Sequence, residues 1–184
     1  MTTLILCDRD SSGFFGVDLG AAVASAVRDA ELVRLDGDAT RPCLGCFQCW
    51  VKTPGICRLT RDDTNSLARR EMRADAVVLV SRITYGGYSY DTKAFLDRTI
   101  QNLAPYFEIV DRRMRHAMRY ERFPVLITLG YGDCTDKETD TFVSLAHHNA
   151  LNMRPPRHAV FTARGADAVE AAVGQVVRAL KEGS

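Results

Sequence analysis

Neither sign of charge dominates this sequence, and no apolar run in it is long enough to cross a membrane. Its 24 basic and 23 acidic residues leave a formal net charge of +1 over 184 residues, so no global field favours nucleic acid or an anionic lipid surface. Near the start, an apolar run of only three residues precedes the first charged ones, which is too short for a signal peptide or a membrane helix. These absences favour a cytoplasmic protein that works on a small-molecule partner, with no nucleic acid and no membrane.

Motifs of several common enzyme classes are also missing. The sequence has no Ser-His-Asp order, no H-E-x-x-H and no P-loop, so hydrolase and kinase functions find no support. Residues 130–132 form a partial G-x-G that lacks the third glycine of a dinucleotide fingerprint. The chain therefore shows no dedicated Rossmann site for a nicotinamide nucleotide. His147 and His148 fall beside the apolar stripe of their predicted helix, which indicates surface positions.

What the chain has instead is a regular alternation of strand-like and helix-like segments, without repeats or linkers. Apolar segments predict strands over residues 4–7, 31–35, 76–81, 124–129 and 159–162. Helical stripes alternate with these strands, including one over residues 63–73 and one from Phe95 to Leu103. Five such units predict a single α/β domain over residues 1–184, with a parallel sheet covered by helices on both faces.

The length and the number of units predict a three-layer sandwich with the strand order 2-1-3-4-5. In that order a crevice lies between the carboxyl ends of the first and third strands, where flavin mononucleotide (FMN) can bind. Residues 105–122 are more than a compact connection requires and predict an inserted arm. Its Tyr106, Phe107 and Ile109 need burial, which predicts a homo-oligomer, either a dimer or a tetramer.

Four of the six cysteines gather within residues 43–57 with the spacing C-x2-C-x2-C-x7-C. A loop can bring Cys43, Cys46, Cys49 and Cys57 onto one centre, and a cubane cluster offers four corners to four thiolates. A single zinc ion usually takes two C-x2-C pairs with a long spacer, so this spacing fits zinc less well. Disulfides are disfavoured because nothing else in the chain indicates secretion. A cluster-free loop that packs its own aromatic side chains is the remaining alternative.

The position of the cysteine loop, residues 41–62, follows from the predicted strand order. The loop leaves the carboxyl end of the second strand, which neighbours the first strand. We therefore expect it to share one edge of the sheet with the FMN crevice, so that a [4Fe-4S] cluster in it would lie beside the flavin.

Together these segments resemble the NADPH-dependent FMN reductase and iron-sulfur flavoprotein family, which has a flavodoxin-like fold. The resemblance covers nearly the whole chain. Its most specific parts are the cysteine loop with its tail up to Cys57, the acidic pair Asp62 and Asp63, and residues 85–98 with the run Lys-Ala-Phe-Leu-Asp-Arg. Residues 105–120 resemble one branch of the family. The resemblance implies a flavoprotein, commonly oligomeric, that accepts electrons from a nicotinamide nucleotide or a redox partner.

The resemblance also points to residues that would contact the flavin. Arg9, Ser11 and Ser12 follow the first strand and are expected at the FMN phosphate. The other expected residues follow the third and fourth strands and surround the flavin ring: Arg82, Ile83, Thr84, Tyr85, Gly86, Gly130 and Tyr131. No catalytic acid or base is expected, because a flavin carries the chemistry itself.

Two features depart from the family pattern. Asp8 and Asp10 stand in the loop that usually forms a Ser-Pro-Arg phosphate cradle, and two carboxylates would repel a phosphate unless they point away from it. Arg82 stands where a proline often opens the ring loop, and it adds a cation near the flavin.

The leading hypothesis is an FMN-dependent oxidoreductase that moves electrons from NAD(P)H through FMN to a small acceptor, such as a quinone or a free flavin. One alternative is an electron carrier between proteins that combines a [4Fe-4S] cluster with a flavin. Another is a flavin-free structural module whose cysteines hold zinc. The basic run around His116 could bind a nucleotide phosphate or line a subunit contact.

Overall fold

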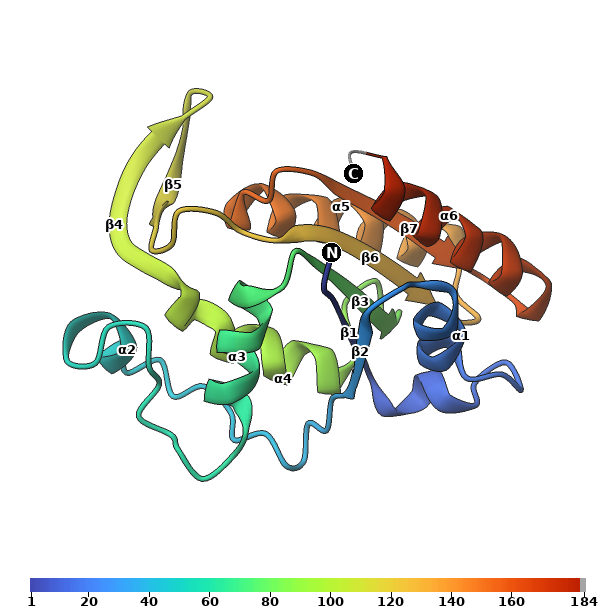
Figure 1. Cartoon of the computed structure of the whole chain (residues 1–184), viewed down its shortest axis with the longest axis horizontal. Coiled ribbons are helices and arrows are strands. Elements are labelled where there is room, and N and C mark those ends of the chain that lie inside the picture. Colours follow the sequence, from blue (N-terminus) through green and yellow to red (C-terminus); the bar gives the residue numbers. More distant parts are fainter. Residues whose placement is uncertain (183–184) are drawn as a thin grey trace.

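The computed structural model describes residues 1–182 and contains a sheet of five parallel strands. Their order is β2-β1-β3-β6-β7, which confirms the predicted order 2-1-3-4-5 when only these strands are counted (Figure 1). The strands are β1 (Thr3–Cys7), β2 (Ala30–Arg34), β3 (Ala76–Arg82), β6 (Val125–Tyr131) and β7 (His158–Ala163). β1 and β3 are buried along almost their whole length, which explains why they read as continuous apolar runs.

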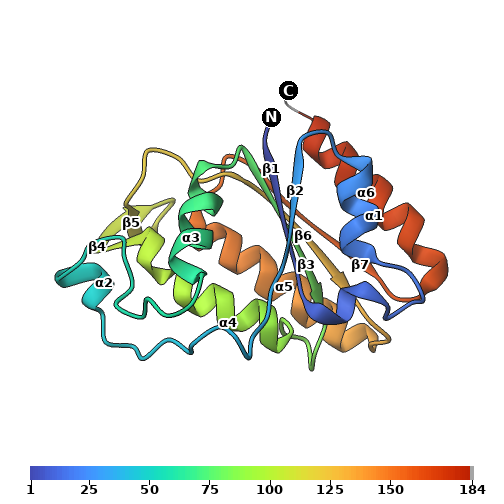
Figure 2. The ribbon, with the colours of Figure 1, turned by 60° about the horizontal axis from the view of Figure 1, so that its bottom comes forward.

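Helices cover both faces of this sheet (Figure 2). The helices are α1 (Leu19–Ala26) and α6 (Val169–Lys181) on one face, and α3 (Thr64–Arg73), α4 (Tyr90–Arg98) and α5 (Asp136–Met153) on the other. Successive strand residues point to opposite faces, so Ile5 packs in the core with α1 and α6. Leu6 packs in the second core, which contains Phe95 of α4. The three-layer α/β prediction is confirmed.

The helix after β3 is shorter than predicted. α4 ends at Arg98, and a 3₁₀ turn, η2 (Thr99–Asn102), separates it from Leu103, which has extended backbone. The predicted helical stripe up to Leu103 is therefore wrong in its last turn. Pro105 explains this in part, because a proline ends helical hydrogen bonding and disfavours helical backbone at the residue before it.

Residues 103–118 form a separate two-stranded antiparallel sheet, made of β4 (Leu103–Val110) and β5 (Arg113–Met118). Asp111 and Arg112 connect the strands with φ angles of 49° and 62°, as a type I′ hairpin turn requires. The hairpin stands away from the main sheet (Figure 1). It occupies most of the segment that was expected to be an arm.

Three short helical elements lie in connections. They are η1 (Arg9–Ser12) after β1, α2 (Gln48–Val51) in the cysteine loop and η3 (Ala166–Ala168) before α6. No helix within residues 1–182 is both long and apolar enough to span a membrane.

Candidate functional site

Three connections meet at the carboxyl ends of β1, β3 and β6. The backbone N–H of Asp8 donates to Val80 at 3.2 Å, and that of Ile83 donates to Tyr131 at 2.8 Å. These bonds hold the start of the β1–α1 connection, the β3–α4 loop and the end of β6 together. The structure therefore brings the residues expected around a flavin to one edge of the sheet, where doubly wound α/β proteins bind their ligands.

The β3–α4 loop contains a tight turn that projects an aromatic ring. Thr84 and Gly87 exchange two backbone hydrogen bonds of 3.0 and 2.9 Å, and the residues between them, Tyr85 and Gly86, have φ angles of 51° and 76°. Tyr85 is 93% exposed. A Cβ at position 86 would lie 2.8 Å from the Thr141 side chain, so glycine is required there. The turn thus offers an aromatic face and two backbone N–H groups at its tip.

The other residues expected at the ring contribute backbone more than side chain. Ile83 and Tyr131 are buried, and a Cβ at Gly130 would lie 2.4 Å from the Phe142 ring. These three positions therefore lie beneath the surface of the candidate site.

Asp8 is a buried carboxylate at the point where these three connections meet. It accepts hydrogen bonds from the Tyr131 hydroxyl at 2.5 Å, from the Arg82 backbone N–H at 2.6 Å and from the Ser11 backbone N–H at 3.1 Å. Burial raises the pKa of the Asp8 carboxyl, although these hydrogen bonds oppose the rise. Burial and the neighbouring Asp8 also raise the pKa of the Tyr131 hydroxyl. Asp8 thus occupies backbone donors that an anionic ligand would otherwise use.

The three residues expected at the phosphate are engaged inside the protein. The Arg9 guanidinium donates to both carboxylate oxygens of Asp91 at 3.1 and 3.0 Å, and to Asp38 at 2.8 Å. The Ser11 and Ser12 hydroxyls each donate to a backbone carbonyl three residues earlier, at 2.7 and 2.9 Å. Ser11 is fully buried. The sequence predicted that these residues follow β1, but it did not predict Asp91 as the acidic partner of Arg9.

Arg82 contacts the connection that follows β1. Its guanidinium donates to Asp10 at 2.9 Å and lies 4.7 Å from the centre of the Phe14 ring. Phe14 in turn packs edge-on against Tyr131, with ring centres 5.6 Å apart. The exposed turn at Tyr85 therefore fits a flavin ring, whereas the expected phosphate donors already have partners.

The four cysteines of the motif line a single small cavity of about 30 Å³. Cys49 and Cys57 are buried, and Cys43 and Cys46 are exposed at its rim. Burial raises the pKa of the Cys49 thiol, and the negative charge of the other three thiolates raises it further.

A buried ion pair closes the base of the cysteine loop. Arg98 donates to Asp62 at 2.8 Å, and their side chains are 0% and 4% exposed. Arg98 also donates to the backbone carbonyls of Arg41 and Leu59 at 2.7 and 2.9 Å, while Asp62 accepts from the Arg41 backbone N–H at 3.0 Å. Both ends of the loop are thereby tied to the end of α4.

Arg98 also faces the cysteines. It lines their cavity, and its Nε is buried without a hydrogen-bond partner. An unsatisfied cationic N–H beside thiolates fits a sulfur-rich anionic group, since an acceptor there would complete its hydrogen bonding. Within residues 1–182, no three His, Cys, Asp or Glu side chains converge tightly enough to hold one metal ion.

The cysteine cavity does not lie where the sequence predicted it. α4 begins near the crevice and runs away from it, and the cysteine cavity adjoins Arg98 and Ile100 at the far end of α4. Figures 1 and 2 show α2 and its loop at that far end. Within one chain the cysteines therefore do not share an edge with the flavin crevice. The expectation failed because the chain after β2 runs along α4 before it reaches Cys43.

Trp50 connects the cysteine loop to the hairpin. Its indole N–H donates to the Ile100 carbonyl at 2.9 Å, and its ring lies 5.0 Å from both Phe47 and His116. His116 also packs against Phe107, at 4.5 Å. His116 therefore lies within an aromatic cluster rather than in an exposed anion site.

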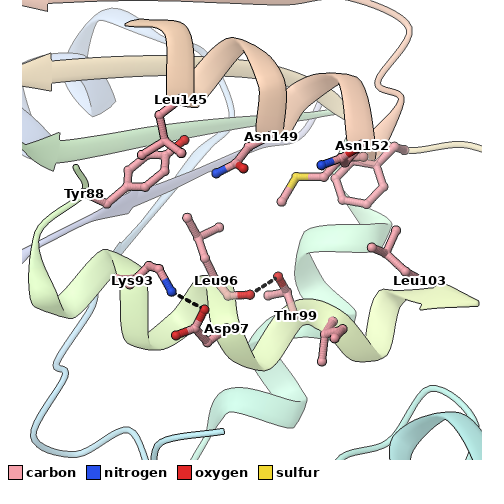
Figure 3. Close-up of a pocket in the computed structure, with 12 residues that line it drawn as sticks. Tyr88, Lys93, Leu96, Asp97, Thr99, Leu103, Leu145, Asn149 and Asn152 are labelled. Carbon is pink, nitrogen blue, oxygen red and sulfur yellow. Dashed lines mark hydrogen bonds and ion pairs between the residues drawn. The ribbon is translucent and has the colours of Figure 1, made fainter. Parts of the chain in front are cut away.

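A second cavity, of about 330 Å³, lies between α4 and α5 (Figure 3). Tyr88 stands at one end and Leu103 at the other, and the amides of Asn149 and Asn152 come from α5. Ile100 lines both this cavity and the cysteine cavity. The volume of the cavity between α4 and α5 suits a small organic molecule.

Comparison with known proteins gives one local sequence match. No family model matches the chain. Iron-sulfur flavoprotein MJ1083 of Methanocaldococcus jannaschii is 31% identical over 78 residues, which is 42% of this chain and 39% of that protein. The match therefore spans about two fifths of the length of this relative.

Solved structures match almost the whole chain. An NAD(P)H:quinone oxidoreductase from Methanothermobacter marburgensis has a TM-score of 0.66 at 14% identity, covering 97% of this chain and 94% of its own. An FMN-dependent NADH-azoreductase from Bacillus anthracis, in complex with FMN, has a TM-score of 0.60 at 14% identity, covering 99% of both chains. A WrbA-like flavodoxin from Agrobacterium tumefaciens has a TM-score of 0.57 at 12% identity, covering 98% of this chain and 96% of its own. The fold of this protein is flavodoxin-like.

Proposed function

We propose that this protein is a flavin-dependent oxidoreductase that takes electrons from NAD(P)H through FMN and passes them to a small acceptor, such as a quinone or a free flavin. The observation that carries the proposal is the Thr84–Gly87 turn, which presents Tyr85 at the topological switch point of a flavodoxin-like sheet. The structural relatives named as quinone oxidoreductase and FMN-dependent azoreductase support it. A bound flavin supplies hydride acceptance and electron transfer.

The chain's own groups would bind and orient the ring. The Tyr85 side chain offers a face for stacking, and the backbone N–H groups of Tyr85 and Gly86 take no part in the two bonds that close the turn. Gly86 lets the turn lie against α5. The reduced thiols and the flavin chemistry suit the cytoplasm, which we propose as the compartment.

Flavin binding and NADPH oxidation test this proposal. We expect the protein to quench the fluorescence of added FMN and to oxidise NADPH in the presence of FMN and a quinone. Tyr85→Ala should weaken binding roughly 2- to 12-fold, since aromatic contacts contribute about 0.5–1.5 kcal/mol beyond buried area. Tyr106→Ala, which truncates another exposed tyrosine on the distant hairpin, should leave binding unchanged. The absence of quenching by excess protein would contradict the proposal.

We also propose that the cysteine cavity holds a [4Fe-4S] cluster, which keeps the electron-carrier function as a second candidate. Cys43, Cys46, Cys49 and Cys57 would be the ligands, and the unpartnered Nε of Arg98 favours an anionic sulfur-rich group beside it. An absorption spectrum with an iron assay on anaerobic protein separates the candidates. A yellow protein that turns over NADPH supports the enzyme, a brown protein reduced only by a protein partner supports the carrier, and a colourless zinc protein supports a structural module.

The hairpin supports a proposed homo-oligomer, a dimer or a tetramer. Its apolar residues Tyr106, Phe107, Ile109 and Met114 are 63–79% exposed. Arg112, Arg113 and Arg115 belong to the same hairpin, which gives the mixture of aromatic and arginine side chains that is enriched in protein interfaces.

A further inference from the structure

The amino end of α1 already carries an anion. In a flavodoxin-like crevice this helix end, with its free N–H groups and the positive end of its dipole, is where a phosphate binds most readily. Here the Asp18 carboxylate accepts a hydrogen bond from the Ala21 backbone N–H at 2.9 Å and caps the helix. Arg34 is paired with Asp18. A carboxylate of the chain itself thus occupies the helix end and caps one of its free N–H groups.

The charges around the connection also oppose a phosphate. The guanidinium of Arg82 is paired with Asp10, and that of Arg9 with Asp91 and Asp38. The ion pairs at this edge comprise five carboxyl groups against three guanidinium groups: Asp10, Asp18, Asp36, Asp38 and Asp91 against Arg9, Arg34 and Arg82. A dianion that entered this end would meet an excess of negative charge.

Aromatic side chains also fill the space next to η1. Phe14 and Phe15 follow η1 and pack against the Tyr131 ring, with ring centres 5.6 and 6.3 Å away. The Arg82 guanidinium lies over Phe14. Aromatic side chains and an ion pair thus cover the region between η1 and the exposed ring turn.

We propose that this crevice recognises a flavin through its ring and discriminates against the phosphate, so that riboflavin binds at least as tightly as FMN. The inference rests on the proposed flavin function. It narrows the ligands of the site to flavins that are bound by their ring and not by a phosphate. A flavin held only at the ring exchanges with solution and acts as a diffusible substrate rather than as a permanent prosthetic group.

Titration of the whole protein with riboflavin and FMN at low ionic strength, followed by quenching of flavin fluorescence, tests the inference. We expect a dissociation constant for riboflavin equal to or below that for FMN. Added salt should reduce the difference, because it screens the exposed carboxylates. Asp10→Asn should tighten FMN roughly two- to fivefold, the effect of one exposed charge, and leave riboflavin unchanged. Asp97→Asn, the same change at the far end of α4, should alter neither constant.

Two outcomes separate this inference from the proposed function. If FMN binds more tightly than riboflavin, the phosphate contributes to binding and the inference is overturned, while the proposed function stands. If the protein quenches neither flavin, the proposed function itself is wrong, and the inference falls with it.

Discussion

Replacing Asp62 by asparagine should strongly destabilise the protein. Asp62 is the carboxylate partner of Arg98, and both side chains are almost fully buried. Removing the charge of one partner leaves the other buried and unpaired, which typically costs about 3–5 kcal/mol. For a chain of this size that loss lowers the melting temperature by roughly 6–20 °C.

The control lies one residue away from Arg98 in the sequence. Asp97 forms an exposed i,i+4 ion pair with Lys93, and such pairs contribute about 0.3–0.5 kcal/mol. Asp97→Asn therefore makes the same chemical change on the same helix without burying a charge. Urea unfolding followed by circular dichroism, at neutral pH, measures both variants. A loss below about 1 kcal/mol for Asp62→Asn, or an equal loss for both variants, would refute the role assigned to the buried pair.

The difference in stability between wild type and Asp62→Asn should depend on pH. Burial alone would raise the pKa of Asp62, but hydrogen bonds from Arg98, Arg41 and Thr64 lower it below its ordinary value of 3.8. A carboxyl whose pKa is lower in the folded state stabilises the protein above its unfolded pKa, and this contribution is lost as the pH falls through the folded pKa. The gap between wild type and Asp62→Asn should therefore be full at pH 5–7 and shrink as the pH falls below about 4.

Three further predictions concern other parts of the molecule. Cys46→Ser should remove the iron chromophore of anaerobically purified protein and leave flavin quenching intact; an unchanged spectrum would show that no cluster binds there. Ile109→Ser should reduce the mass measured by light scattering at micromolar concentration, and a monomeric wild type would contradict the proposed oligomer. Burial raises the pKa of Glu71 from 4.5 to about 8, so the folded protein keeps a proton that the unfolded chain releases and stability falls as pH rises between these values. Glu71→Gln should flatten this part of the stability curve, and a curve of unchanged slope would contradict it.

The sheet and its functional edge could be predicted because they depend on patterns along the chain. Continuous apolar strands separated by helical stripes define a parallel sheet, and the strand order then fixes which loops meet. Arg9, Tyr85 and Tyr131 were expected at one edge for this reason, and the structure brings them there. Topology alone was enough to place these residues.

The partners of the charged side chains could not be predicted in the same way. Arg98 reads as an ordinary basic residue at the end of a helix, yet it is 1% exposed. Its partner Asp62 lies 36 residues earlier in the sequence. The run Lys-Ala-Phe-Leu-Asp-Arg marked Arg98 as part of a family pattern without giving it a role. Such pairings depend on tertiary packing, which a local pattern does not contain.

The route of the cysteine loop failed as a prediction for a related reason. The carboxyl end of β2 lies next to β1, but the chain after it has no regular element to hold it there until α2. Its path is set by contacts far away in the sequence, including those of Trp50 with Ile100 and of Arg98 with Arg41. A loop's starting point therefore did not determine where its ligands lie.

The hydrogen bond between Arg41 and Asp62 has a consequence for the order in which the protein folds and binds a metal centre. Because the two ends of the cysteine loop are joined to each other and to α4, hydrogen bonds that need no metal hold the loop closed. Folding of the domain and loading of a metal centre can then occur as separate events, in that order. A chelator that strips such a centre would leave a folded protein ready to be reloaded, unlike a small zinc domain, which unfolds when it loses its metal.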